Sequence, residues 1–151
     1  MPAPTPRLIP NPLAQPDGRW TSAQDAILSD AGFDEAMAQI RSWPGYAPTP
    51  LVDLPALARQ IGVGALHYKD EGGRFGLGSF KALGGAYAVG KLIARAGRPA
   101  REVTVCSATD GNHGRSVAWG AAMFGCRCVI FVHATVSEAR ERAIEAYGPE
   151  V

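Results

Sequence analysis

The sequence carries almost no excess charge of either sign, since 15 Lys and Arg residues stand against 14 Asp and Glu residues in a chain of 151. It therefore lacks the basic surface that attracts nucleic acid or an anionic membrane over a distance. It also lacks any apolar run close to the ~20 residues that a membrane-spanning helix needs. These absences argue against nucleic-acid and membrane partners, and the 46 % of hydrophobic residues predicts a globular fold.

Cysteine is also scarce, with three residues at Cys106, Cys126 and Cys128. An odd number in a chain of this length is not the pattern of a disulfide framework. A zinc site around Cys126 and Cys128 would need Cys106 or His133 as further ligands, which is a weak set. We therefore expect no metal site, and we expect the cysteines to be small buried hydrophobic residues in a reducing cytosol.

Proline is concentrated at the start of the chain, where residues 1–20 hold six of the 12 prolines. Proline removes backbone donors, so neither a helix nor a strand ladder is expected, and the segment is predicted to be an extended arm. It has neither the basic start nor the apolar core of a secretory signal. A cytoplasmic location is therefore expected.

Helix start and stop signals divide the rest of the chain into short segments. Ser22 with Asp25 and Thr135 with Glu138 have the spacing of capping boxes, and Asp53 is placed to cap a helix. The expected helices cover about residues 22–31, 33–43, 54–61, 80–96, 114–124 and 136–147, and the expected strands cover about residues 65–69, 103–108 and 126–133.

The alternation of strands and helices after residue 99 predicts an α/β fold in which parallel sheets are flanked by helices. The chain stops at Glu150 and Val151, where the pattern calls for another strand. A parallel layer that stops there leaves an uncovered edge, so we expect this chain to be part of a larger protein.

The first site signal is a glycine-rich segment, since six of the fourteen residues 72–85 are glycine. Neither phosphate-binding pattern fits: Ser79 stands where a Walker motif has lysine, and Lys81 stands at the third glycine of a dinucleotide fingerprint. What remains is Lys81, just inside a helix start and beside Phe80. A partly desolvated lysine at a helix N-terminus loses its proton more readily, which suits a Schiff-base nucleophile. An ordinary solvated surface lysine is the alternative.

The second signal is the segment 107–114, Ser-Ala-Thr-Asp-Gly-Asn-His-Gly, between an expected buried strand and a helix. Ligands of parallel α/β sheets bind at the carboxyl ends of strands. Asp110 can exchange a proton there, and Asn112 can donate or accept a hydrogen bond. Asp-Gly-Asn is also an ordinary turn sequence, so these residues alone leave both interpretations open.

Together with Thr49-Pro-Leu51, the two motifs in this order resemble the fold-type II pyridoxal-phosphate enzymes, the tryptophan synthase β group. Within that group the chain is most similar, over about residues 43–151, to diaminopropionate ammonia-lyase. The segments that carry this similarity are Lys-Asp-Glu, Phe-Gly-Leu-Gly-Ser-Phe-Lys-Ala-Leu-Gly-Gly and Thr-Asp-Gly-Asn-His-Gly-Arg. Asp110 is the subfamily signal, because the dehydratases of the group usually have a small residue there. Ser116 is a departure, since a glycine is expected at that position.

The resemblance implies roles for four residues. Lys81 would form a Schiff base with pyridoxal 5'-phosphate and, once released by the substrate, would take the Cα proton. Phe80 would pack near the cofactor, Asn112 would hydrogen-bond its phenolic oxygen, and Asp110 would be a second acid or base. The implied reaction is the α,β-elimination of 2,3-diaminopropionate to pyruvate and ammonia.

The resemblance also implies a division of the chain. After the arm, residues 21–98 would belong to the large domain of a two-domain, tryptophan synthase β-like architecture, and residues 99–151 would be the opening βαβα of the small domain. The phosphate-binding loop, the residue that holds the pyridine nitrogen and a second catalytic aspartate of the family lie further along. We therefore expect an incomplete, N-terminal portion of an enzyme that is a homodimer at full length.

Two alternatives stay open. A threonine or serine dehydratase of the same fold also expels a β-substituent, so Lys81 and Asn112 do not separate it from an ammonia-lyase. A non-catalytic fragment, or one half of a split protein, would instead act by association and would expose apolar surface.

Overall fold

The computed structural model describes residues 9–14 and 18–151. Most of the predicted extended arm, at residues 1–8 and 15–17, lies outside the described residues. The chain divides into two units, residues 1–34 and 35–151, each of which is described by itself. The expected boundary between the large and the small domain, near residue 98, does not coincide with this division and stays a prediction.

The first unit contains a short helix, α1 (Ser22–Asp25), and the start of α2 (Asp30–Arg41). Helix α1 begins at Ser22, as predicted, but ends at Asp25 rather than near residue 31, and α2 begins at Asp30 rather than near residue 33. The Thr21 backbone N–H donates to the Gln24 side chain at 2.7 Å, so the capping box starts one residue before Ser22. The Ser29 hydroxyl accepts the Gly32 backbone N–H at 3.0 Å and starts a new helix, which is why α1 does not extend to residue 31.

The second unit begins with the rest of α2 and a small antiparallel pair of strands, β1 (Leu51–Asp53) and β2 (His67–Lys69), joined by α3 (Pro55–Ile61). No strand was predicted at residues 51–53, so this antiparallel pair is an addition to the parallel strands expected after residue 99. The Asp53 cap was also wrong: the carboxylate binds His67 Nδ1 at 2.5 Å on the neighbouring strand, and Leu54 is the N-cap residue. Helix α3 ends at Ile61, where the expected range 54–61 also ends, and Gly62 follows in a left-handed conformation with a φ of 74°.

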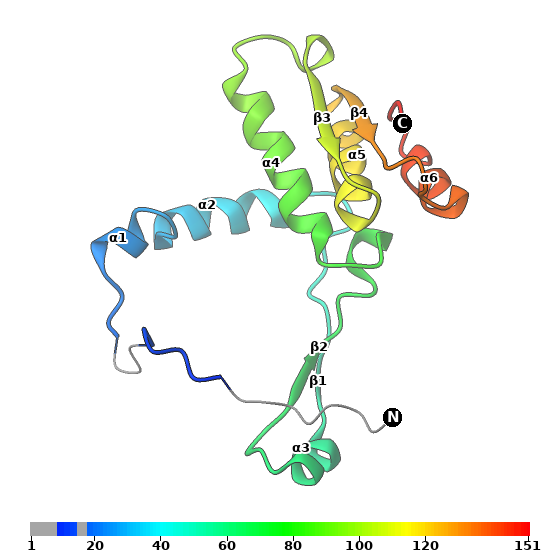
Figure 1. Ribbon diagram of the computed structural model, residues 1–151. Helices are drawn as coiled ribbons and strands as arrows, with labels where there is room; N and C mark the ends of the chain where they lie inside the picture. Colours follow the sequence, from blue (N-terminus) through cyan, green and yellow to red (C-terminus); the bar gives the residue numbers. More distant parts are fainter. Residues whose placement is uncertain (1–8, 15–17) are drawn as a thin grey trace. The chain divides into compact units, whose positions relative to one another are not determined.

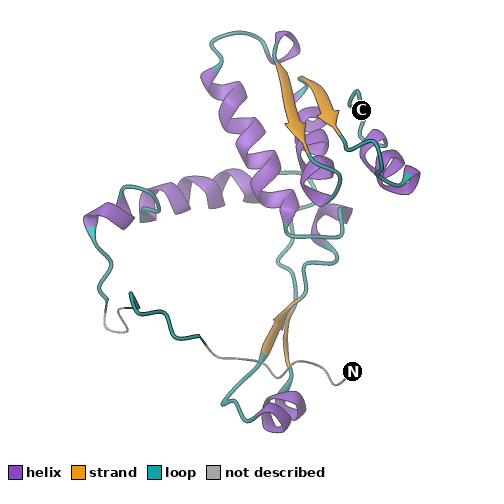
Figure 2. Ribbon diagram, in the orientation of Figure 1, coloured by secondary structure: helices purple, strands orange, loops and turns teal. Residues whose placement is uncertain are grey.

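The remaining elements form the predicted alternation of helices and strands (Figures 1 and 2). They are α4 (Lys81–Arg95), β3 (Thr104–Ala108), α5 (Asn112–Phe124), β4 (Arg127–Phe131) and α6 (Glu138–Glu145). The strands β3 and β4 are parallel, and Glu150 adds a further parallel bridge to Val129. Ser137, not Thr135, is the N-cap residue of α6, because the Thr135 hydroxyl binds His133 at 2.8 Å.

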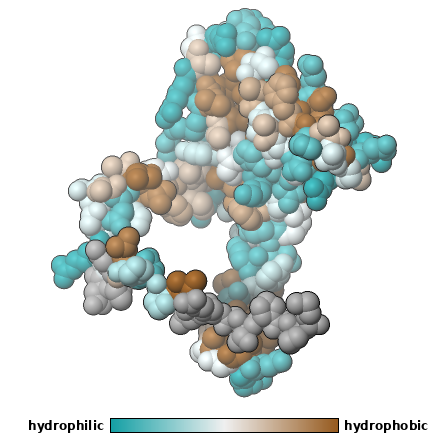
Figure 3. All heavy atoms as spheres, viewed as in Figure 1, coloured by the Kyte–Doolittle hydropathy of each residue, from teal (hydrophilic) through white to brown (hydrophobic). Residues whose placement is uncertain are grey.

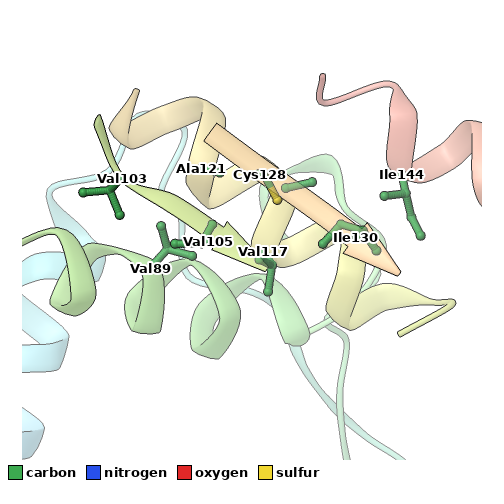
Figure 4. Packing of buried hydrophobic residues seen from close by; sticks show 9 residues of the cluster. Val89, Val103, Val105, Val117, Ala121, Cys128, Ile130 and Ile144 are labelled. Atoms are coloured by element: carbon green, nitrogen blue, oxygen red, sulfur yellow. The ribbon is translucent and has the colours of Figure 1, made fainter. Parts of the chain in front are cut away.

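The hydrophobic core lies between β3, β4 and the helices α4, α5 and α6 (Figure 4). Val89 of α4, Ile130 of β4 and Ile144 of α6 are almost completely buried. The prediction that all cysteines are buried was wrong: Cys128 belongs to the core, whereas Cys106 is exposed. The burial of these apolar side chains is the main force that holds the helices against the strands.

Helices α4 and α5 pack side by side and run in the same direction (Figure 1). Gly85 lies against Ser116, and Gly90, further along α4, lies against Phe124, further along α5. The N-termini of both helices are therefore at the same end of the unit. Because α5 follows β3, this is also the end at which the parallel strands finish, where α/β proteins bind their ligands.

Several apolar side chains remain on the surface, among them Leu92 and Phe131, which are 57 % and 61 % exposed. Figure 3 shows apolar atoms gathered over α4 and β3 at the top of the view. Within the described part of the chain, no helix combines the length and the hydropathy needed to cross a bilayer.

Candidate functional site

The glycine-rich segment is anchored at its start by a buried ion pair. Arg74, 7 % exposed, donates through Nε and Nη2 to both carboxylate oxygens of Glu71, at 2.7 and 2.8 Å. The Thr49 hydroxyl joins the pair, and Arg74 also reaches the Ala47 carbonyl at 3.0 Å. The hydrogen bond from Arg74 lowers the pKa of the Glu71 carboxyl to about 2, against the opposing effect of burial. These contacts therefore fix the start of the glycine-rich segment, ahead of the first turn of α4.

The middle of the segment is held by aromatic packing. Phe75 has a positive φ of 50°, in the short 3-10 turn Arg74–Gly76. Its ring lies 4.9 Å from that of Trp119 on α5 and 5.9 Å from that of the buried Trp43. A left-handed conformation is unfavourable for a residue with a side chain, so the aromatic contacts must outweigh that cost. They fasten the glycine-rich segment to α5.

Lys81 is the first residue of α4, as the sequence predicted. Its amino group lies 5.1 Å from the centre of the Phe80 ring. The predicted partial desolvation was wrong, because Lys81 is exposed and Phe80 is itself 57 % exposed. The lysine therefore presents its amino group at the open end of α4, with an aromatic face beside it.

The three lysines of the chain all lie in its described part, and they differ in their partners. Lys69 donates to the Thr49 carbonyl at 2.6 Å, and Lys91 binds the Glu35 carboxylate. Among the described residues, nothing forms a hydrogen bond or an ion pair with the Lys81 amino group. Lys81 is thus the lysine whose amine is available to a ligand.

Asp110 and Asn112 lie at the other helix start, that of α5. Gly111 is the N-cap residue, and Asn112 is the first residue of the helix rather than part of a turn before it. Both side chains line a surface hollow of about 420 Å³, together with Arg115 and Arg140. Arg140 of α6 donates to the Asp110 carboxylate at 3.4 Å. This places an acid, an amide and two cations around one opening.

The two helix starts are joined by Ser116, whose hydroxyl donates to the Lys81 carbonyl at 2.6 Å. Asn112 lies one turn before Ser116 on the same face of α5. The structure thus brings Lys81 and Asn112 to one end of the α4–α5 pair, although Lys81 and Phe80 do not line the hollow around Asp110.

The sequence did not single out Arg140, Arg115 or Ser79 as site residues. Among the described residues, Ser79 Oγ and Arg115 Nε are buried without a hydrogen-bond partner. Such atoms are costly to leave unpaired, and both lie beside the glycine-rich segment or the start of α5. No local pattern could have revealed Arg140, because it meets Asp110 only through the fold.

The comparison with known families gives this arrangement a context. A family model described as pyridoxal-phosphate dependent enzyme matches residues 42–151. The chain belongs to this family. The part of the chain that matches this pyridoxal-phosphate dependent enzyme family contains the glycine-rich segment, Lys81 and the start of α5.

Individual relatives agree with the family match. The diaminopropionate ammonia-lyase of Salmonella typhimurium is 36 % identical over 148 residues, covering 86 % of this chain and 37 % of that protein. The catabolic L-threonine dehydratase of Staphylococcus aureus is 30 % identical over 125 residues, covering 83 % and 34 %. The chain spans about a third of the length of the curated relatives that it matches.

Solved structures show the same fold. The diaminopropionate ammonia lyase of Escherichia coli, in complex with an aminoacrylate-PLP azomethine reaction intermediate, has a TM-score of 0.70 and 38 % sequence identity, covering 80 % of this chain and 33 % of that one. The chain therefore has the mixed α/β fold of the pyridoxal-phosphate dependent enzymes and represents part of it.

Proposed function

We propose that this chain supplies the lysine-bearing part of a pyridoxal-phosphate-dependent diaminopropionate ammonia-lyase. The reaction is the α,β-elimination of 2,3-diaminopropionate, which with one water gives pyruvate and two ammonia. The observation that carries the proposal is the availability of the Lys81 amine at the start of α4, beside the start of α5. The similarity to the ammonia-lyases supports the substrate, since it is higher and longer than that to the threonine dehydratase.

The residues of this site fit the cofactor by their chemistry. The Lys81 amine, which has no partner among residues 9–14 and 18–151, suits the cofactor aldehyde, the Asn112 amide suits its phenolic oxygen, and Phe80 offers an exposed aromatic face. The buried, unpaired hydroxyl of Ser79 leaves a further donor two residues before Lys81. When bound, the pyridine ring draws electrons away from the Cα of an amino acid.

The protein's own groups would then move the protons. Lys81 Nζ would hold the cofactor through its aldehyde carbon and, once replaced by the substrate amine, would accept the Cα proton as a neutral amine. Asp110 acts as the second acid or base and takes the proton of the D-isomer, which points the opposite way. Arg140, 3.4 Å from the Asp110 carboxylate, orients that carboxylate at the edge of the hollow. Asn112 fixes the ring by its phenolic oxygen.

The wider architecture follows the same proposal. Residues 21–98 would belong to the large domain and residues 99–151 to the small one, and the site would form where the starts of α4 and α5 meet. The homodimer and the cytoplasmic location expected for the full-length enzyme stay predictions.

Covalent trapping tests the assignment of Lys81. The chain is incubated with pyridoxal phosphate, reduced with borohydride and digested, and the adducts are located by mass spectrometry. We expect an adduct confined to Lys81, abolished by Lys81→Arg and retained by the control Lys91→Arg, which preserves a cation opposite Glu35. No adduct, or labelling spread evenly over the three lysines, would refute the assignment.

Substrate selection tests the reaction. With the loaded chain in excess, pyruvate release from D- and L-diaminopropionate is compared with 2-oxobutyrate release from threonine. We expect release from diaminopropionate to exceed that of a Lys81→Ala chain, and Asp110→Ala to abolish the excess for the D-isomer. Asp53→Ala, which removes a carboxylate from another exposed ion pair, is the matched control. Faster release from threonine would favour the dehydratase, and no dependence on Lys81 would favour a non-catalytic fragment.

A further inference from the structure

Ser116 is completely buried, yet its hydroxyl is directed to the backbone of the proposed cofactor-binding lysine. It donates to the Lys81 carbonyl at 2.6 Å, across 35 residues of sequence and from a different helix. That carbonyl also accepts the Gly85 N–H in the regular pattern of α4. The Ser116 hydroxyl therefore uses the second lone pair of an oxygen that is already bound.

The first turn of α4 has no side-chain cap, since its N-cap residue, Phe80, makes no side-chain hydrogen bond to the helix. Its backbone donors at Ala82 and Leu83 reach only the adjacent carbonyls of Ser79 and Phe80, at 3.4 and 3.0 Å. A first turn held by such local contacts frays unless a neighbouring element also holds it. Lys81 is the first residue of this turn, so its position depends on what holds the turn in place.

The space for the Ser116 hydroxyl is provided by the missing side chain of Gly85. A Cβ atom placed on Gly85 would overlap the hydroxyl and would lie 2.8 Å from Ser116 Cβ. The serine and the glycine thus form a matched pair, in which α5 inserts a hydrogen-bond donor into a gap in α4. A larger residue at either position is incompatible with this contact.

We propose that Ser116 is a positioning residue, which fixes the backbone of Lys81 against α5 and so directs the lysine amine toward the cofactor. The role of the lysine rests on the proposed function, but the hydrogen bond and its effect on the first turn of α4 do not. Ser116 itself contacts neither substrate nor cofactor. Its effect passes through the Lys81 carbonyl.

The test compares Ser116→Ala with Ser42→Ala. Ser42 is a matched control because its hydroxyl also donates to a backbone carbonyl, that of Gln39, at 2.7 Å and away from Lys81. Amide hydrogen exchange is measured for the peptide that covers the first turn of α4. We expect about five-fold faster exchange there in Ser116→Ala, the population change that corresponds to one hydrogen bond.

The second readout is the yield of the borohydride-reduced pyridoxal phosphate adduct on Lys81, per mole of protein at a fixed, limiting time of incubation. We expect this yield to fall about five-fold in Ser116→Ala, in proportion to the exchange, and to stay unchanged in Ser42→Ala. Amide exchange outside α4 is the internal reference, because a general loss of structure would accelerate it as well. A yield on Lys81 that is the same with and without the hydroxyl would overturn the proposal.

The two readouts separate this inference from the proposed function. Faster exchange in Ser116→Ala, in a chain whose Lys81 takes up no cofactor, would support the backbone contact and refute the assignment of Lys81. Selective labelling of Lys81 that is insensitive to Ser116 would support the assignment of Lys81 and refute the positioning role.

Discussion

The close approach of α4 and α5 predicts opposite effects for alanine at two neighbouring glycines. Gly85 faces α5, and an added methyl group would overlap the Ser116 hydroxyl and lie 2.8 Å from Ser116 Cβ and 3.3 Å from its carbonyl carbon. Rotation of the hydroxyl relieves only the first of these contacts. Gly84, the preceding residue, has no atom of the described residues within 4 Å of its added methyl group and serves as the control.

The magnitudes follow from competing terms. Alanine stabilises a helix by about 1 kcal/mol relative to glycine, and at Gly84 nothing opposes this gain. At Gly85 the same gain is offset by overpacking, which costs about 1–3 kcal/mol. Displacement of the Ser116 hydroxyl from the Lys81 carbonyl leaves a buried donor unpaired, at a further cost of about 1–3 kcal/mol. We expect Gly85→Ala to lower the free energy of unfolding by roughly 3 kcal/mol.

A compensating substitution isolates the contact. Ser116→Gly removes the atoms that the new methyl group meets, so it should be far less harmful in the Gly85→Ala background than in the original chain. In a double-mutant cycle we expect a coupling free energy of about 2 kcal/mol in favour of the double variant. Additive effects would show that the two positions do not touch.

The assay is urea unfolding followed by tryptophan fluorescence, because Trp43 and Trp119 lie in the aromatic cluster that holds the middle of the glycine-rich segment. The free energy of unfolding and its dependence on urea are extracted for the Gly84→Ala, Gly85→Ala and double variants. A Gly85→Ala chain as stable as the Gly84→Ala chain would refute the reasoning, since the helices would then have room for a methyl group between them.

Three further predictions concern the Glu71 carboxylate, the backbone conformation of Phe75 and the cysteine thiols. The hydrogen bond from Arg74 holds the pKa of Glu71 near about 2, so the stability that this carboxylate contributes is present above about pH 4.5 and is lost as the pH falls toward about 2. Glu71→Gln should therefore lose less stability over that interval in urea unfolding, and an identical loss would contradict the assignment. Phe75→Gly should be more stable than Phe75→Ala by about 1 kcal/mol, because glycine tolerates the positive φ, and thermal unfolding of the two variants decides this. Burial raises the pKa of the Cys128 thiol to about 11, so a thiol-specific reagent near pH 8 should label the exposed Cys106 first, and faster labelling of Cys128 would contradict its burial.

The parts of the fold that depend on neighbours in sequence could be predicted from the sequence. The expected ranges 54–61, 80–96 and 114–124 agree closely with α3, α4 and α5, and the glycines that follow α3 and α5 are left-handed in the structure. The position of Lys81 at a helix start followed from the same local signals. These features require no knowledge of the rest of the molecule.

The errors arose where a distant partner competes with a local one. Asp53 has the side chain of a helix cap, but His67 on the adjacent strand binds its carboxylate instead. Arg140 meets Asp110 across 30 residues, and Ser116 meets Lys81 across 35. The periodicity of a helix or a strand reports only on residues that are close in sequence and does not reveal such contacts. The sequence therefore indicated the proposed site residues but not the partners that hold them.

The glycine-lined contact between α4 and α5 has a consequence for mutational tolerance. At Gly85 and Gly120, a single added carbon would come within 3 Å of the Cβ atom of Ser116 and the Cα atom of Ala86, which have little freedom to move away. In a saturation mutagenesis library these positions should accept almost no other residue, whereas Gly84 should accept many. The most restrictive positions of the pair would then be residues that have no side chain and take no part in any reaction, and they would mark the helix contact in a selection for folded protein alone.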